Sequence, residues 1–253
     1  MNKWGKRLLS LLVLVAFLAI WKGYVEVSRI PAYLLPPPER VLAGIVKLWH
    51  TGDLQKHLGV TFEEIAIGTL IGSVLGVIFG YVLAKSELLE RVISPYILIA
   101  QTAPKISLAP LFLLWFGLGI TSKVVLVALV VFFPITINVM LGIRSIGKDM
   151  INLLRILKAS RWQRFLWLEV PAALPMAMAG FRISTTQAVV AAIIGELMGA
   201  KAGLGFLLTL GSETYDIVMI LSSVTVMSFL GLISYWVVAY LEARLLTWHE
   251  SKT

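Results

Sequence analysis

Long apolar stretches alternate with short polar ones along this chain. At a rise of about 1.5 Å per residue, a helix needs about 20 apolar residues to cross the hydrocarbon core of a bilayer. The pattern therefore predicts an all-α, polytopic membrane protein that forms a single domain over residues 1–253. The six predicted spans are residues 8–24, 61–84, 92–116, 124–141, 171–197 and 217–241.

The first apolar stretch could also be read as a signal peptide, because Lys3, Lys6 and Arg7 precede it. No small-x-small cleavage site follows, so we expect a retained first span that starts in the cytoplasm. Between spans, we expect a short surface helix at Glu39–Trp49 and a polar loop at residues 199–216.

Composition strengthens the membrane interpretation and sets an orientation. Hydrophobic residues make up 58% of the chain and charged residues 14%, whereas a soluble domain has about 25% charged residues. The net charge of +8 fits the positive-inside rule better than nucleic-acid binding. With the N-terminus inside, most basic residues fall on the cytoplasmic side, together with both termini and the loop at residues 144–170.

There is no cysteine, and the three histidines lack metal-ligand spacing, so no metal site is predicted.

The loop at residues 144–170 is a basic, amphipathic segment between two spans. Ser160 and Gln163 have the spacing of a capping box, which predicts that a helix begins at Arg161. We therefore expect two short helices with a break near residues 158–160. The alternative is one membrane-surface helix with ordinary basic anchors.

Two features within the spans have a structural and a functional interpretation. Gly68, Gly72, Gly76 and Gly80 share one helix face, which predicts close packing either within the chain or against another subunit. In the third span, Pro104, Lys105 and Pro110 would be costly facing lipid, since a central lysine costs about 2.5–3.5 kcal/mol.

Broken helices are tolerated where they line a cavity, so we expect this part of the third span to border a translocation pathway. Alternatively, Lys105 snorkels to the inner interface. Arg182 and Glu196 in the fifth span are further pathway candidates, or else satisfied buried polar residues.

Motifs for catalysis are absent from the sequence. No P-loop, H-E-x-x-H or G-x-S-x-G motif occurs, so ATP binding and hydrolysis are not expected of this chain. The stretch from Gly199 to Gly205 is superficially like a phosphate-binding loop, but no strand precedes it, and we interpret it as a flexible turn.

Several stretches together resemble a known family, the permease subunits of ABC importers, and in particular the nitrate/sulfonate/taurine-type branch. The resemblance runs from about residue 34 to 245. It is carried by Leu157-Lys-Ala-Ser-Arg-Trp-Gln-Arg-Phe165, Val170-Pro-Ala-Ala-Leu-Pro175, Ala179-Gly-Phe-Arg182, Ala109-Pro-Leu-Phe-Leu-Leu-Trp-Phe-Gly-Leu-Gly119 and Leu35-Pro-Pro-Pro38.

The resemblance implies a type I importer-permease fold and a homodimer of this chain. It also implies two cytoplasmic ATP-binding subunits, which hold ATP–Mg, and an external substrate-binding protein. In the family a short cytoplasmic helix docks on the ATPase, which assigns coupling to about Asn152–Arg164. The coupling candidates are Leu153, Leu154, Leu157, Lys158, Ala159, Ser160, Arg161, Trp162 and Arg164.

The coupling segment departs from the family pattern at two places. Asn152-Leu153-Leu154 replaces the usual Glu-Ala-Ala, and Lys158 replaces the usual glycine. A lysine in a left-handed turn costs about 1–2 kcal/mol, so we expect either a different turn or a side chain held by a partner.

The sequence thus predicts a permease subunit for a small solute, an anion such as nitrate, a sulfonate or taurine. Close relatives suggest a heterocyclic nutrient instead, such as a thiamine precursor or riboflavin. From a different class, an ion-coupled secondary transporter would use Lys105, Arg182 and Glu196 for coupling, although no inverted repeat is visible. An intramembrane enzyme has no nucleophile and base to support it.

Overall fold

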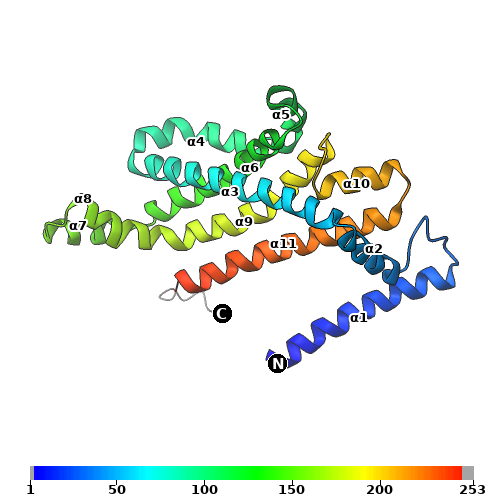
Figure 1. Cartoon of the computed structure of the whole chain (residues 1–253). Helices are drawn as coiled ribbons and strands as arrows, with labels where there is room; N and C mark the ends of the chain where they lie inside the picture. Colours follow the sequence, from blue (N-terminus) through cyan, green and yellow to red (C-terminus); the bar gives the residue numbers. More distant parts are fainter. Residues whose placement is uncertain (1–2, 247–253) are drawn as a thin grey trace.

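The computed structural model describes residues 3–246, and within that range the chain is helical with no strand (Figure 1). Two segments depart from α-helix, the 3-10 turn η1 and the π-helix η2. The elements are α1 (Lys3–Val27), α2 (Pro38–His50), α3 (Asp53–Lys85), α4 (Glu87–Thr102), η1 (Lys105–Leu108), α5 (Ala109–Phe116), α6 (Ile120–Arg144), α7 (Lys148–Ile156), α8 (Arg161–Arg164), η2 (Phe165–Glu169), α9 (Val170–Leu197), α10 (Leu204–Glu213) and α11 (Ile217–Leu245).

Five of the described helical segments are long and apolar enough to cross a membrane. They contain five of the six predicted spans, and α2 lies where the short surface helix was expected. The predicted span at residues 92–116 corresponds instead to a pair, α4 and η1–α5, that meets at a bend of 81°. The all-α polytopic fold is therefore confirmed, with one span broken.

Only one of the three prolines in this region breaks the helix. Pro95 lies inside α4, and Pro110 lies in the first turn of α5, where a missing N–H costs nothing. At Pro104 the preceding residue, Ala103, is forced out of the helical region to φ −59° and ψ 142°. The bend follows from that one restriction.

The centre of the bundle is formed by α3, α6 and α9. The four glycines of α3 lie against α6 of the same chain. A Cβ atom at Gly72 would lie 2.5 Å from the carbonyl oxygen of Ala128, and one at Gly80 would lie 2.5 Å from that of Thr136. The glycine stripe thus brings two helix backbones into contact, as small residues do within membranes.

Helix α10 corrects one prediction. Residues 199–216 were expected to form a polar loop, but Leu204–Glu213 is a helix whose Leu204 and Leu207 are buried. Its length of 10 residues is too short for a span, so a search for long apolar stretches passes over it.

Helix α1 lies apart from the rest of the bundle (Figure 1). Its main contact within the described chain is with α2, and only 6% of its most apolar stretch is buried. In the same view α7 and α8 lie at one end of the bundle, the left end, and α10 lies toward the other. We refer to these as the α7–α8 end and the α10 end.

Candidate functional site

The segment from α7 to α8 is the first candidate site, and it contains the predicted break. Helix α7 ends at Ile156, and the chain turns at Lys158, which has a left-handed φ of 53°. The backbone N–H of Ala159 donates to the carbonyl of Leu154 at 2.9 Å, which closes the turn. The left-handed turn is therefore kept although lysine stands there.

Ser160 then starts α8 as a complete capping box, which confirms that prediction. The N–H of Gln163 donates to the Ser160 hydroxyl at 3.2 Å, and the N–H of Ser160 donates to the Gln163 side chain at 2.7 Å. Two N–H groups that the helix cannot pair internally are satisfied within four residues.

The outer surface of this segment is apolar and basic. Among its apolar side chains, the exposed fractions are 50% for Leu153, 66% for Leu157 and 66% for Trp162. Arg155, Lys158 and Arg161 are exposed beside them, whereas Leu154 and Ala159 are half-buried. We call Leu153, Leu157, Lys158, Arg161 and Trp162 the coupling surface. Large exposed apolar side chains that cluster together are typical of a surface that another protein or a membrane covers.

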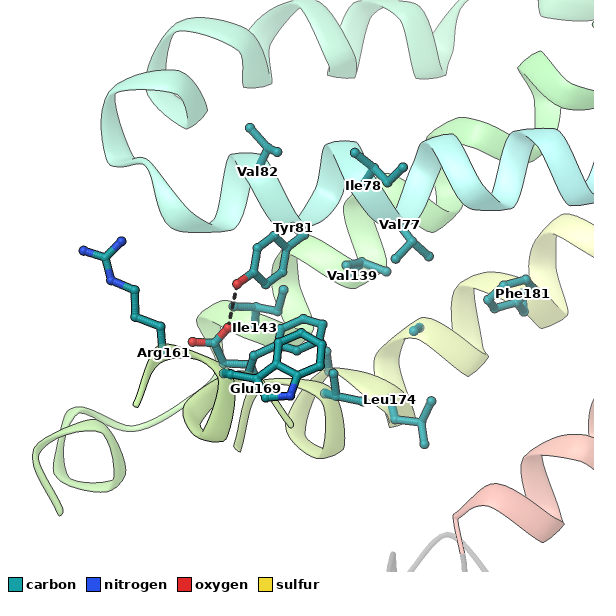
Figure 2. A pocket seen from close by; sticks show the side chains of 15 residues that line it. Val77, Ile78, Tyr81, Val82, Val139, Ile143, Arg161, Glu169, Leu174 and Phe181 are labelled. Carbon is teal, nitrogen blue, oxygen red and sulfur yellow. Dashed lines mark hydrogen bonds between the residues drawn. The ribbon is translucent and has the colours of Figure 1, made fainter. Parts of the chain in front are cut away.

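Glu169 of η2, just after the coupling segment, binds two residues of α3. The sequence did not predict this contact. The Tyr81 hydroxyl donates to the Glu169 carboxylate at 3.0 Å, and Lys85 forms an ion pair with its other oxygen. Figure 2 shows the Tyr81 ring pointing from α3 toward Glu169. Glu169 is the only acidic residue in the basic stretch from Asn152 to Pro171, which is the signal that was available.

Tyr81 and Glu169 line an apolar cavity of about 750 Å³, whose lining side chains are drawn in Figure 2. Arg161, Trp162 and Phe165 line it from the coupling segment, and Val77 and Ile78 line it from α3. The Trp162 and Phe165 rings stack with their centroids 5.4 Å apart. Within the coupling surface, Arg161 and Trp162 therefore border this cavity, whereas Leu153, Leu157 and Lys158 are exposed and do not line it.

The bend between α4 and α5 is the second candidate site. The Lys105 ammonium donates to the carbonyl of Gln101 at 2.6 Å, and it lies 5.3 Å from the centroid of the Phe133 ring. Pro104 and Lys105 border a cavity of about 440 Å³ together with Gln187. Because Phe133 and Gln187 lie near the middle of α6 and α9, Lys105 lies at mid-height of the bundle and not at the α7–α8 end.

Arg182 has a different set of partners. Its guanidinium forms an ion pair with Glu242 of α11 and lies 5.6 Å from the centroid of the Tyr235 ring. Lys105, Arg182 and Glu196 therefore do not form one site in the described chain, since each has partners of its own.

Glu196 lies at the α10 end, with an exposed fraction of 1%. The Thr61 hydroxyl donates to its Oε1 at 2.6 Å, and the backbone N–H of Gly205 donates to its Oε2 at 2.6 Å. The N–H of Leu204 donates in turn to the Thr61 hydroxyl at 2.8 Å, and that of Gly203 donates to His57 at 3.0 Å. In the stretch from Gly199 to Gly205, which resembles a phosphate-binding loop, the last three backbone N–H groups therefore bind side chains of the same chain. This stretch is a turn, as expected, and these hydrogen bonds tie it to α3 and α9.

Within residues 3–246, no group of three or more His, Asp or Glu side chains is arranged to hold a metal ion. A bundle of apolar helices with one broken span and a basic segment between α6 and α9 points to a membrane transport subunit as the class of protein. Comparison with known proteins makes this specific. Residues 72–247 match the family "Binding-protein-dependent transport system inner membrane component", and the chain belongs to that family.

Three relatives illustrate the range of this family. The chain is 33% identical to the riboflavin transport system permease protein RibX of Chloroflexus aurantiacus, over 94% of this chain and 89% of that one. It is 33% identical to the formylaminopyrimidine transport permease protein ThiX of Halalkalibacterium halodurans, over 95% and 96%. It is 30% identical to the putative aliphatic sulfonates transport permease protein SsuC of Bacillus subtilis, over 96% and 88%.

The resemblance to the nitrate/sulfonate/taurine branch is confirmed, because permeases named for sulfonates, taurine and nitrate are among the matches. The fold is similar to that of a chain of the MetNI methionine ABC transporter in an inward-facing conformation. The TM-score is 0.64 at 19% identity, over 74% of this chain and 93% of that one. This likeness shows the type I importer-permease fold and, at that identity, the fold alone.

Proposed function

We propose that this chain forms the translocation pathway of an ATP-driven importer. It works as a homodimer with two cytoplasmic ATP-binding subunits, which hold ATP–Mg and carry out the hydrolysis, and with an extracytoplasmic substrate-binding protein. The observation that supports this most is the coupling surface, where apolar side chains stay exposed at the end of a helix that runs into the bundle.

Movement of the ATP-binding subunits would enter the bundle through that helix. Helix α8, η2 and α9 run continuously from Arg161 to Leu197, so a push on α8 acts directly on α9. Glu169 lies on the same continuous helix and binds Tyr81 and Lys85, so the push also reaches the end of α3. Two of the three central helices, α3 and α9, would thereby move together.

The proposed orientation places the α7–α8 end and both termini in the cytoplasm. The basic residues of the coupling segment support it, since cytoplasmic loops carry an excess of lysine and arginine. The α10 end then faces the substrate-binding protein.

The proposed pathway runs beside the α4–α5 bend, where Pro104 and Lys105 border a cavity and Pro110 starts α5. A basic side chain at mid-height favours a small anion such as nitrate, a sulfonate or taurine. With Arg182 paired to Glu242, Lys105 is the residue on which this preference rests. A heterocyclic nutrient is the second candidate, because RibX and ThiX are named for riboflavin and formylaminopyrimidine.

Reconstitution into liposomes tests the proposal. The chain should move solute only with its cognate ATP-binding subunit, binding protein and ATP, and the uptake should stop when any of the three is omitted. Uptake driven by a proton or sodium gradient without the ATP-binding subunit would overturn it.

A second experiment distinguishes the two substrate classes. It measures the affinity of the cognate binding protein for nitrate, alkanesulfonates, riboflavin and formylaminopyrimidine.

A further inference from the structure

A buried group of charged side chains lies at the α10 end, and the proposed function does not use it. Glu64 of α3, Lys123 of α6 and Glu196 of α9 have exposed fractions of only 1–2%. The Lys123 ammonium donates to the carbonyls of Leu118 at 2.6 Å and Gly119 at 3.0 Å. Two carboxyl groups and one ammonium are therefore enclosed together, which leaves one negative charge in excess if all three are ionised.

The Glu196 carboxyl group has hydrogen-bond donors around it, whereas one oxygen of the Glu64 carboxyl group has none. Glu196 accepts from the Thr61 hydroxyl and from the N–H of Gly205. The Oε2 atom of Glu64 is buried and accepts no hydrogen bond from the described chain. Glu64 instead borders a small cavity of about 340 Å³, with Lys123 on its other side. An ionised carboxylate that is buried without donors is among the costliest arrangements in a protein.

Glu64 lies one helical turn after Thr61 on α3, and the Thr61 hydroxyl binds Glu196, so the two buried carboxyl groups are neighbours. A hydrogen bond between two carboxyl groups requires a proton on one of them, since two carboxylates at that separation only repel. The donors on Glu196 stabilise its ionised form, and the lack of donors on Glu64 favours its protonated form. One proton on Glu64 makes the group neutral, with Lys123 balancing Glu196.

We propose that Glu64 and Glu196 form a proton-binding site, in which protonated Glu64 donates a hydrogen bond to ionised Glu196. Loss of the proton breaks the O–H bond of Glu64 and leaves two carboxylates facing the single ammonium of Lys123. The other titratable groups nearby are His57 and the exposed Glu63 on α3, and Lys201 of the loop before α10, which lines the same cavity.

The site has a consequence for the start of α10. Glu196 holds the N–H of Gly205 directly and that of Leu204 through Thr61. A second negative charge beside Glu196 would repel it from this position. The proton therefore keeps α10 fixed to α3 and α9, at the end that faces the binding protein in the proposed orientation.

Infrared spectroscopy of the purified chain in detergent tests the site directly. A protonated carboxyl group has a C=O band that ionised carboxylates lack, so the wild type should show this band at neutral pH and lose it on titration to alkaline pH. The variant Glu64→Gln should lack the band, whereas Glu63→Gln, one residue away and exposed, should keep it. A wild-type protein without the band at neutral pH would overturn the proposal, and this needs no variant to fold.

Thermal unfolding provides the second measurement. From about pH 4.3, where a glutamate in the unfolded chain ionises, up to the pH at which the infrared band disappears, the folded wild type binds one proton more than the unfolded chain. Its unfolding temperature should therefore fall with rising pH over that range and not beyond it. Glu64→Gln should lose most of that dependence, and Glu63→Gln should retain it. If sodium at constant pH stabilises the wild type and not Glu64→Gln, a metal cation occupies the site and the proposal is wrong. These readouts involve no transport, so they are independent of the proposed function.

Discussion

The carboxylate of Glu196 occupies the space that a side chain at Gly203 would need. A Cβ atom at Gly203 would lie 2.2 Å from the Glu196 carboxyl carbon. Gly203 also has φ 117°, a conformation that other residues rarely adopt. The turn before α10 and the buried acid are thus fitted to each other, although seven positions separate them along the chain.

Gly203→Ala should therefore destabilise the protein by about 2–4 kcal/mol, from backbone strain and the clash with Glu196 together. Thermal unfolding of the purified chain measures the loss. Gly59→Ala is the control, because nothing lies within 4 Å of a Cβ atom at that position and its φ is not positive. Equal stability of the two variants would mean that the turn can move away from Glu196.

Replacing Lys158 by glycine should stabilise the coupling segment. The left-handed turn at φ 53° costs a lysine about 1–2 kcal/mol, whereas glycine adopts it freely, and the greater freedom of glycine in the unfolded chain offsets part of the gain. Protection of the Ala159 amide from hydrogen exchange reports on the turn. Lys158→Ala removes the same charge but keeps a Cβ atom, so it should show no gain.

Glutamate in place of Leu153 should weaken binding of the ATP-binding subunit by about tenfold or more, because a charge would enter an apolar contact. Co-purification at increasing salt, or a direct titration, measures this. Arg91→Gln makes the same change of charge at an exposed position on α4 and should leave binding intact. If both variants bind equally well, the partner docks elsewhere.

Glu169→Gln should uncouple ATP hydrolysis from transport. The amide cannot form the ion pair with Lys85 and keeps at most the hydrogen bond from Tyr81, so less of the movement of α8 would reach α3. In proteoliposomes we expect ATP hydrolysis to continue while the solute moved per ATP falls. Glu87→Gln is the matched control, since its pair with Arg91 is exposed and contributes little. Equal solute transport per ATP in both variants would show that Glu169 only anchors the segment.

The sequence predicted the features whose causes are local. The capping box of Ser160 and Gln163 needs residues three positions apart, and the spans need only a run of apolar residues. The pairing of Tyr81 with Glu169 joins residues 88 positions apart, and nothing in either neighbourhood indicates it. The same is true of Glu64, which reads as one more polar residue at the start of a span until Lys123 and Glu196 are placed beside it.

Lys158 illustrates a second limit. Its side chain argued against a left-handed turn, and the turn is present nonetheless. Closing hydrogen bonds and a good N-cap on the next helix outweigh a penalty of about 1–2 kcal/mol. Local preference indicates what a conformation costs, and the surrounding contacts decide whether it forms.

The glycine stripe of α3 has a mechanical consequence. Backbones that touch along four successive turns cannot slide past each other without opening gaps at every glycine. Helices α3 and α6 therefore behave as a single stiff strut. A force applied at the α7–α8 end would therefore be carried by both helices together to the α10 end.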